Sequence, residues 1–283
     1  MSSDIVSGQY RFFDARVLRS RRLGPTMVRI TLGGEQLRAF TSGGRDQSFS
    51  LFLPHPGQHA PVLPDRTGEG WFAAWRAVDE SERAVMRSYT IRAQRREPDE
   101  LDVDFALHGD LGPASRWAAG AGPGDRVVLL GPVIEDNRSV GFRPPDDTDW
   151  VLLAADETAL PAVGGILEWL PPHTRARVFV EVPNAADIQD LDAPAEAEIT
   201  WLVRESAAPG VDGPLLAAIR AAELPAGTPY AWIAGESGAV RALRRHLVGE
   251  RGFDRRLVGF SGYWRLGTSE EQLLAEKLAA ATG

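Results

Sequence analysis

Residues 150–171, WVLLAADETALPAVGGILEWLP, decide the fold of the second half of the chain. The first seven residues form a continuous apolar run that ends in Asp156, a pattern typical of a strand buried on both faces of a parallel sheet. A short turn and a helical apolar pattern follow directly. A buried strand that leads into a helix predicts a βα unit, from which parallel sheets with helices on both faces are built.

The same alternation continues downstream. Strand-like runs stand at residues 177–183, 199–205, 229–236 and 255–264, and helical patterns at 213–224 and 237–250. We therefore predict a doubly wound α/β domain with a parallel sheet at residues 146–267. The amphipathic pattern SEEQLLAEKLAAA follows it and predicts a C-terminal helical extension within residues 268–283.

The sequence upstream has the pattern of β structure. Short strand-like runs bounded by Gly, Pro or polar turns stand at residues 11–24, 27–34, 48–54, 88–94, 101–108 and 126–132. They predict a closed or nearly closed antiparallel β-barrel of Greek-key type at residues 1–145. One helix, GPASRWAAGA at residues 112–121, interrupts the strands. The polar, Pro-rich stretch 136–149 is interpreted as the linker to the α/β domain.

The composition excludes several classes of protein. With 283 residues, 43% hydrophobic and 25% charged, the chain has globular composition and a length that fits two domains. The absence of cysteine excludes disulfides, thiolate metal sites and thiol nucleophiles. No apolar run reaches the about 18 residues of a membrane helix, and the N-terminus lacks the pattern of a signal peptide. We therefore expect a cytosolic protein that neither spans nor binds a membrane.

Charge is distributed unevenly along the chain. The net charge is -8, of which residues 1–145 contribute +1 and residues 146–283 contribute -9. This balance argues against nucleic-acid binding, which needs a cationic surface. Lys277 is the only lysine, so arginine, which suits phosphate recognition, supplies nearly every cation. His55 and His59 are separated by a Pro-Gly pair that breaks any helix, and we expect no metal site there.

Two segments of the first half are candidates for binding a phosphate-bearing cofactor. On a strand, Arg87 and Tyr89 share one face, where an arginine could bind phosphate and a tyrosine could stack on a ring. Ser88 and Thr90 share the other face. The helix that opens with Pro113 begins with free amides, which form an anion site, and Ser115 adds a hydroxyl. Spacing alone leaves open a half-buried strand with surface arginines and an ordinary proline-initiated helix.

Six segments taken together resemble a known family. They are RSYTIR (87–92), DFALHGDLGPASRWA (104–118), GDRVVLLGP (124–132), WVLLAADETALPAVGGILEWLP (150–171), WIAGESGAVRALRRHL (232–247) and GYWRLG (262–267). In order and spacing they are similar to the siderophore-interacting protein family, flavin-dependent ferric-siderophore reductases related to the ferredoxin–NADP reductase superfamily. The resemblance covers residues 11–267 and implies a tightly but non-covalently bound FAD, with NADH or NADPH as electron donor.

The resemblance also implies a role for each matching residue. Tyr89 would stack on the flavin ring, Thr90 would approach its N5 atom, and Arg87 would bind phosphate. The full set implied to contact the flavin is Arg87, Ser88, Tyr89, Thr90, Asp104, Ala106, His108, Ala114, Ser115, Asp156, Glu157, Thr158, Ala159 and Trp264. Gly235 and Glu236 would lie on the nicotinamide side, and Ser50, Tyr263 and Arg265 would line the substrate pocket. The flavin carries the chemistry, so no side chain is assigned a catalytic role and no metal ligand is needed.

One position departs from the family pattern. The strand before the first long loop usually reads D-x-H-V-K-L in the family, whereas this chain has DQSFSL at residues 46–51, with Ser50 in place of lysine. An anionic ferric chelate favours a cationic pocket. The pocket could therefore use Arg265 or Arg45 instead, or the substrate could be less anionic, such as a hydroxamate complex. The substitution also leaves open that the family's substrate does not apply to this chain.

The leading hypothesis is a monomeric, cytosolic, FAD-dependent reductase that passes electrons from NAD(P)H to a ferric siderophore and releases Fe(II). One alternative is a general flavin reductase or electron-transfer flavoprotein with a protein acceptor. Another is a non-catalytic siderophore-binding protein.

The electron donor is less constrained. No G-x-G-x-x-G fingerprint follows the α/β strands, so nucleotide binding of the ordinary Rossmann type is not expected. Glu181, Asp187 and Asp190 would repel a 2′-phosphate if they lie at the ribose, which favours NADH. Ferredoxin is a further possible donor. The arginine cluster Arg241–Arg256 is either a solvated face or a site for a protein donor or a nucleotide phosphate.

Overall fold

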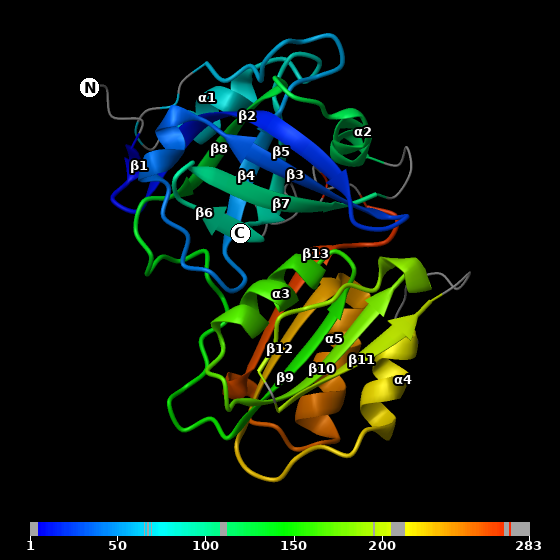
Figure 1. Ribbon diagram of the computed structural model, residues 1–283. Helices are drawn as coiled ribbons and strands as arrows, with labels where there is room; N and C mark the ends of the chain where they lie inside the picture. The colour runs from blue at the N-terminus through cyan, green and yellow to red at the C-terminus, as the bar shows by residue number, and fades with distance from the viewer. Residues whose placement is uncertain are drawn as a thin grey trace. The chain divides into compact units, whose positions relative to one another are not determined.

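The computed structural model describes residues 5–64, 66, 68, 70–107, 112–194, 196–204, 213–268 and 272. The chain divides into two compact units, Met1–Gly141 and Phe142–Gly283 (Figure 1). The predicted C-terminal helix lies outside the described residues except for Gln272.

The first unit is built on an antiparallel sheet. Its strands are β1 (Ile5–Ser7), β2 (Tyr10–Arg22), β3 (Met27–Gly33), β4 (Ser48–Leu53), β5 (Val85–Thr90), β6 (Ala93–Arg95), β7 (Glu100–Ala106) and β8 (Arg126–Pro132). The strand order is β5-β4-β8-β2-β3-β7-β6, with β1 paired to β2. Among the described residues β5 and β6, at the two ends of this order, are not paired with each other. The sheet is therefore an open half-barrel, which confirms the nearly closed form of the predicted barrel rather than the closed one.

The concave side of the half-barrel holds the core. Alternate residues of the strands point inward, among them Phe13, Ile30, Leu51, Val103 and Leu129, all fully buried. The predicted helix is α2 (Pro113–Gly120), and it adds Ala114 and Ala118 to this core. Helix α2 contacts β3, β5 and β7 and therefore lies beside β5, the predicted cofactor strand.

Two features of this unit differ from the sequence prediction. A second helix, α1 (Trp71–Ala77), and a 3-10 helix, η1 (Glu35–Ala39), are present in addition to α2. Helix α1 has only seven residues, too few to show helical periodicity, and it packs Trp71 and Trp75 on Phe12 and Phe52 outside the barrel.

The second difference is a divided strand. The run 88–94, predicted as one strand, is divided between β5 and β6. The division occurs because the Ile91 N–H donates to Gln47 of the β4 side, whereas the Arg92 N–H donates to Asp102 of β7. The chain changes its pairing partner there, and a single-strand pattern cannot show such a change.

The second unit is the predicted doubly wound α/β fold. Its strands are β9 (Trp150–Asp156), β10 (Arg175–Val182), β11 (Ala197–Val203), β12 (Pro229–Glu236) and β13 (Val258–Trp264). Its helices are α3 (Leu160–Trp169), α4 (Pro214–Ala221) and α5 (Ser237–Gly249), with 3-10 turns η2 (Ala185–Asp187) and η3 (Arg255–Leu257). All strand pairs are parallel, in the order β11-β10-β9-β12-β13.

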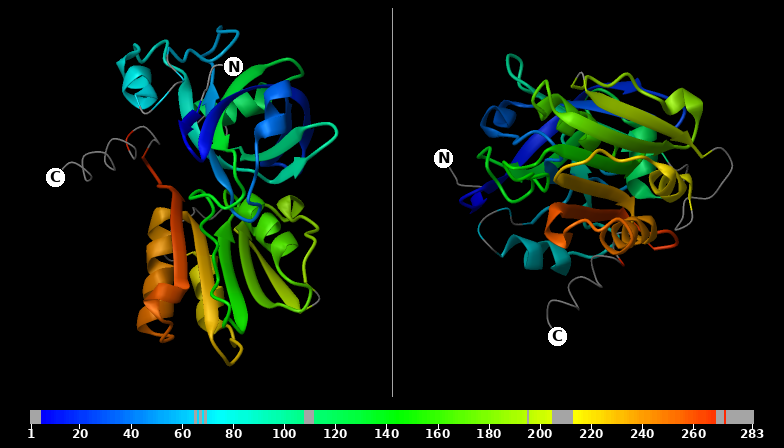
Figure 2. Two further views of the ribbon diagram at one scale, coloured as in Figure 1. Left: turned by 90° about the vertical axis from the view of Figure 1, so that its left-hand side faces the viewer. Right: turned by 90° about the horizontal axis from the view of Figure 1, so that it is seen from below.

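Helices cover both faces of this sheet, as Figure 2 shows. Helix α3 packs on one face against Val151 and Leu153, and helices α4 and α5 pack on the other against Leu152 and Ala154. Because β9 is buried on both sides, its run is apolar at every position up to Asp156. The strand order reverses between β9 and β12, and open α/β sheets bind ligands beside such a reversal, outside the carboxyl ends of the strands.

None of the described helices is both long enough and apolar enough to pass through a membrane.

Replacing Gly131 by alanine should destabilise the barrel unit. A Cβ at Gly131, on β8, would overlap the ring of Phe40, which is fully buried. We expect the free energy of unfolding to fall by about 1–3 kcal/mol, the usual cost of overpacking. Gly120→Ala is the matched control, because its Cβ would meet no atom within 4 Å. Urea unfolding of the two variants measures the difference, and equal stability would refute this packing.

Candidate functional site

The carboxylate of Asp156 joins the ends of three strands. Its Oδ1 accepts hydrogen bonds from the Thr158 amide (2.9 Å) and hydroxyl (2.5 Å), in the turn after β9. Its Oδ2 accepts from the Glu236 amide at the end of β12 (2.7 Å) and from the Trp264 indole N–H at the end of β13 (2.9 Å). One buried side chain therefore fixes the carboxyl edge of the sheet, the edge where the parallel strands end.

Glycines allow this close approach. Gly235, on β12, has φ 140°, and a Cβ there would lie 2.5 Å from Asp156 Oδ2. A Cβ at Gly262 would lie 2.5 Å from the Ser237 hydroxyl. The β12–β13 register also shifts here, from Gly235 opposite Gly262 to Glu236 opposite Trp264. The resulting irregularity brings the Trp264 indole to the Asp156 carboxylate.

The first turns of two helices at this edge are already bonded to carboxylates of the chain. Glu236 Oε2 accepts from the amides of Gly238 (2.6 Å) and Ala239 (2.8 Å), which begin α5. Glu181 Oε2 accepts from the Leu215 amide in the first turn of α4 (3.3 Å). A diphosphate at a helix N-terminus needs such amides to be free. This arrangement agrees with the lack of a G-x-G-x-x-G fingerprint.

A buried ion cluster lies beside Asp156. Arg204, directly after β11, donates to Glu157 (2.8 Å) and to Glu181 (2.7 Å), and all three side chains are buried. Burial lowers the pKa of Arg204, but its bonds to Glu157 and Glu181 outweigh burial and raise it overall. Arg204 was not among the predicted site residues. The only sequence signal for it is an arginine at the end of a strand-like run.

The pKa of Asp156 is raised to about 6. Burial is the largest cause, and the negative charge of Glu157 adds to it, whereas the hydrogen bonds from Thr158, Trp264 and Glu236 oppose the shift.

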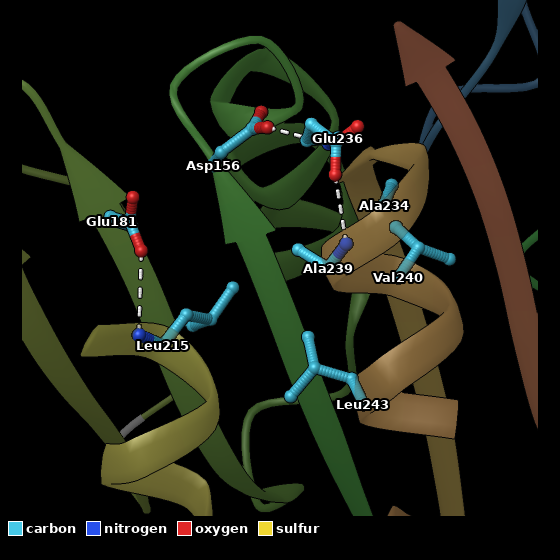
Figure 3. A pocket seen from close by; sticks show the side chains of 8 residues that line it. All are labelled: Asp156, Glu181, Leu215, Ala234, Glu236, Ala239, Val240 and Leu243. Carbon is cyan, nitrogen blue, oxygen red and sulfur yellow. Dashed lines mark hydrogen bonds between the residues drawn. The ribbon is translucent and has the colours of Figure 1, made fainter. Parts of the chain in front are cut away.

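A cavity lies at this carboxyl edge, between β9, β10 and β12 of the sheet and helices α4 and α5 (Figure 3). Its lining consists of three carboxylates and five aliphatic side chains: Asp156, Glu181, Glu236, Leu215, Ala234, Ala239, Val240 and Leu243. No cationic side chain is among these lining residues. Such a cavity can accept hydrogen bonds from hydroxyl groups but has an unfavourable field for phosphate.

The barrel unit contains a second group of predicted residues. Tyr89 of β5 contacts Phe105 of β7 (ring centroids 4.3 Å apart), which contacts Trp117 of α2 (5.8 Å). Tyr89 is half-buried, so part of its ring stays accessible. Arg87 lies on the same face and is buried, donating to the Met86 carbonyl (2.8 Å). The strand thus places a guanidinium and an aromatic ring together, as its alternation predicts.

The first turn of α2 belongs to the predicted cofactor site. Its N-cap is Gly112, which has no side chain to cap the helix, and the turn itself contains no acidic residue. Ala114 and Ser115 are buried there.

Asp104 and Ala106 lie on the other face of β7 from Phe105, because strand residues alternate. Asp104 is held by Arg29 of β3 through two bonds, of 2.6 and 2.8 Å. Arg29 was also missed by the sequence prediction, because the pairing joins residues 75 positions apart. His108 lies outside the described residues.

The remaining predicted residues are divided between the units. Ser50 is on β4, with Ser88 directly opposite on β5, and Thr90 is buried at the end of β5. In the second unit, the Ala159 amide bonds the Asp156 carbonyl (3.1 Å), and Arg265 Nε donates to the Thr268 hydroxyl (3.1 Å). Tyr263 packs partly buried against the core of its unit.

Comparison with known families finds a match in each unit. Residues 16–136 match the model of the siderophore-interacting FAD-binding domain. Residues 148–267 match the model of the siderophore-interacting protein family.

Individual proteins are similar over nearly the whole chain. The ferric vibriobactin reductase of Vibrio cholerae is 31% identical, over 98% of this chain and 97% of that protein. The NADPH-dependent ferric-chelate reductase of Escherichia coli is 35% identical, over 92% of this chain and 95% of that protein. Among solved structures, a siderophore utilization protein from T. fusca is 38% identical with a TM-score of 0.78, covering 92% of this chain and 95% of that one.

The raised pKa of Asp156 predicts a loss of stability with rising pH. Because its folded-state pKa of about 6 exceeds the ordinary 3.8, the folded protein binds the proton more tightly than the unfolded chain. The free energy of unfolding should therefore fall between about pH 4 and about pH 6, by on the order of 2–3 kcal/mol. This component should be absent from Asp156→Asn, as measured by urea unfolding across that pH range.

The matched control is Asp254→Asn. Asp254 is exposed, and its hydrogen bonds to Arg256 lower its pKa to about 2, outside the window. The control should keep the fall seen in the wild type. If Asp156→Asn keeps it as well, the raised pKa belongs to another group.

Proposed function

The chain belongs to the siderophore-interacting protein family, and from that premise we propose that it is a flavin-dependent reductase of ferric siderophores. Electrons pass from a nicotinamide nucleotide through bound FAD to the iron. The observation that carries the proposal is the match over more than nine-tenths of the chain to proteins named ferric vibriobactin reductase and ferric-chelate reductase.

The residues of the barrel unit fit FAD. A diphosphate needs hydrogen-bond donors, and the Arg87 guanidinium and the N-terminus of α2 would supply them. A flavin ring needs a flat partner, and the half-buried Tyr89 ring, braced by Phe105, offers one. When bound, FAD supplies the ability to accept a hydride and to release electrons singly, as reduction of Fe(III) requires.

The chain's own contribution is binding and orientation. Tyr89 and the N-terminus of α2 would fix the flavin. The Asp156 carboxylate holds the Trp264 indole at the carboxyl edge of the α/β sheet. Oxygen-rich chelators hold Fe(II) more weakly than Fe(III), so reduction releases the metal without any protein ligand. Among the described residues, no three His, Asp or Glu side chains are grouped to hold a metal ion.

The acidic edge of the second unit supports NADH as the donor. Glu181 stands near the end of β10, the second strand of the α/β unit, and its carboxylate lines the cavity at the carboxyl edge. A 2′-phosphate there would face Asp156, Glu181 and Glu236, and the buried Arg204 is already bonded to two glutamates. Of the three acids predicted to repel a 2′-phosphate, Glu181 is the one that lines this cavity. Asp187 is fully buried and accepts a hydrogen bond from Asn184, whereas Asp190 is exposed.

Ferredoxin is the alternative donor within this proposal. Three arginines of the cluster, Arg241, Arg245 and Arg255, are exposed and could attract an acidic protein. The others are engaged: Arg251 bonds three carbonyls at the end of α4, Arg256 bonds Asp254, and Arg244 covers the Phe260 ring. We propose a monomer, since each unit encloses its own hydrophobic core.

The reductase proposal predicts a yellow protein that contains FAD and reduces a ferric hydroxamate anaerobically with NADH or NADPH, detected with a ferrous trap. Tyr89→Ala should lower flavin retention by at least about tenfold, or about 1.4 kcal/mol, because ring stacking is lost. Tyr89→Phe, which keeps the ring, is the control. No ferrous signal with any class of chelate would overturn the reductase proposal.

The donor proposal predicts a kcat/KM for NADH at least about tenfold above that for NADPH, a difference of about 1.4 kcal/mol. Glu181→Gln should narrow this ratio, since it removes one of the charges that face a 2′-phosphate. Asp190→Asn, at an exposed position, should leave the ratio unchanged. An equal or higher kcat/KM with NADPH would contradict the assignment.

A further inference from the structure

Arg204 joins the ends of three strands of the α/β unit. It stands directly after β11, and its own amide donates to the Val182 carbonyl at the end of β10 (2.9 Å). Its guanidinium donates to both carboxylate oxygens of Glu157, in the turn after β9 (2.8 and 3.2 Å), and to Oε1 of Glu181, on β10 (2.7 Å). All three side chains are buried. One planar cation therefore fixes the carboxyl ends of β9, β10 and β11.

Glu181 connects this ion cluster to the cavity at the carboxyl edge of the sheet. Its Oε2 accepts from the Leu215 amide in the first turn of α4 (3.3 Å), and its side chain lines the cavity (Figure 3). Arg204 and Glu157 are not among the lining residues. The carboxylate of the pair therefore faces the cavity while its counter-ion does not, and a ligand in the cavity meets the negative partner.

The other two carboxylates of the cavity are held in a different way. Asp156 accepts from backbone amides, a hydroxyl and an indole, and Glu236 accepts from the amides of Gly238 and Ala239. The side chains that α4 and α5 contribute to the lining are aliphatic. Among the lining residues, Glu181 is thus the carboxylate that is bonded to a cation, so its charge and position depend on Arg204.

This pairing decides whether a negative charge can stay in the cavity wall. Burying a carboxylate is costly unless a counter-ion or hydrogen bonds compensate for the lost water. Without Arg204, Glu157 and Glu181 would be two neighbouring buried acids with no counter-ion, and buried carboxyl groups in that situation keep their protons to higher pH. A protonated Glu181 would no longer repel a phosphate. The guanidinium therefore controls the field that a ligand meets without touching the ligand.

We propose that Arg204 is a positioning residue that sets the choice of nucleotide. It holds the Glu181 carboxylate in the cavity wall, and the wall then selects a nucleotide with a free ribose 2′-hydroxyl over one with a 2′-phosphate. A hydroxyl can donate a hydrogen bond to the carboxylate, whereas a phosphate monoester, with up to about two negative charges at neutral pH, is repelled by it. This inference rests on the proposed reductase function with NADH as donor, and it adds the residue that determines the preference.

The test measures the ratio of kcat/KM for NADH to kcat/KM for NADPH in wild type and in Arg204→Met. The range is pH 7 to pH 9, above the pKa of about 6 of Asp156. The wild type should keep a ratio of about tenfold or more throughout. In Arg204→Met the ratio should fall to within about threefold at pH 7 and rise again toward pH 9, as the buried acids lose their protons. A purely structural role would lower both kcat/KM values together and leave the ratio independent of pH.

Three further variants support this comparison. Arg177→Met is the matched control, because Arg177, near the start of β10, pairs with Glu198 between the same two strands but away from the carboxyl edge. Arg204→Lys keeps a cation and should keep the ratio within about threefold of wild type. If Arg204→Met does not fold, its combination with Glu157→Gln leaves a single unpaired acid and should show the same pH-dependent ratio.

Calorimetric binding of ADP-ribose and of its 2′-phosphate, neither of which contains nicotinamide, separates the inference from the function. Tighter binding of ADP-ribose that is lost at pH 7 in Arg204→Met but not in Arg177→Met supports the role of Arg204, even if no ferric complex is reduced. Reduction of ferric complexes with a donor ratio that Arg204→Met does not change overturns that role and leaves the reductase function intact. Equal binding of the two nucleotides by the wild type also overturns it.

Discussion

The carboxylate of Asp156 is the constraint on which the α/β site depends. It is buried, it accepts hydrogen bonds from three separate segments, and glycine at position 235 is required for the backbone to pass it. Burying a carboxylate is costly unless its oxygens are bonded, and here each oxygen accepts two bonds. The ends of β9, β12 and β13 are consequently held in one arrangement, and the Trp264 indole with them.

The groups proposed to bind cofactors differ between the two units. In the barrel unit, they are the buried Arg87 and the N-terminus of α2, both hydrogen-bond donors. In the α/β unit, glutamates of the chain already accept from the Leu215 amide of α4 and from the Gly238 and Ala239 amides of α5. The second unit therefore offers acceptors, which suit the hydroxyls of a nucleotide better than its phosphates. The net charges of the two halves agree with this difference: residues 1–145 have a net charge of +1 and residues 146–283 a net charge of -9.

The sequence was sufficient for the features that are local. The strand bounds 150–156 and 229–236 coincide with their apolar runs, and the helix after Pro113 begins where a proline and free amides predict it. Features that depend on distant partners could not be predicted. Arg204 bonds glutamates 23 and 47 positions away, and Arg29 bonds an aspartate 75 positions away. The predicted roles of the flavin and substrate residues rest on the family resemblance, and the structure contributes their surroundings.

The central claim, that this chain transfers electrons from a nicotinamide nucleotide to ferric iron through a bound flavin, is tested most directly by one anaerobic titration. The visible absorption of the purified flavoprotein is followed as one equivalent of NADH and then a neutral ferric trihydroxamate are added. We predict that NADH abolishes the absorption of the oxidised flavin, and that two equivalents of the ferric complex restore it with the release of two equivalents of Fe(II). A flavin that NADH does not reduce, or that stays reduced in the presence of the ferric complex, would contradict the claim.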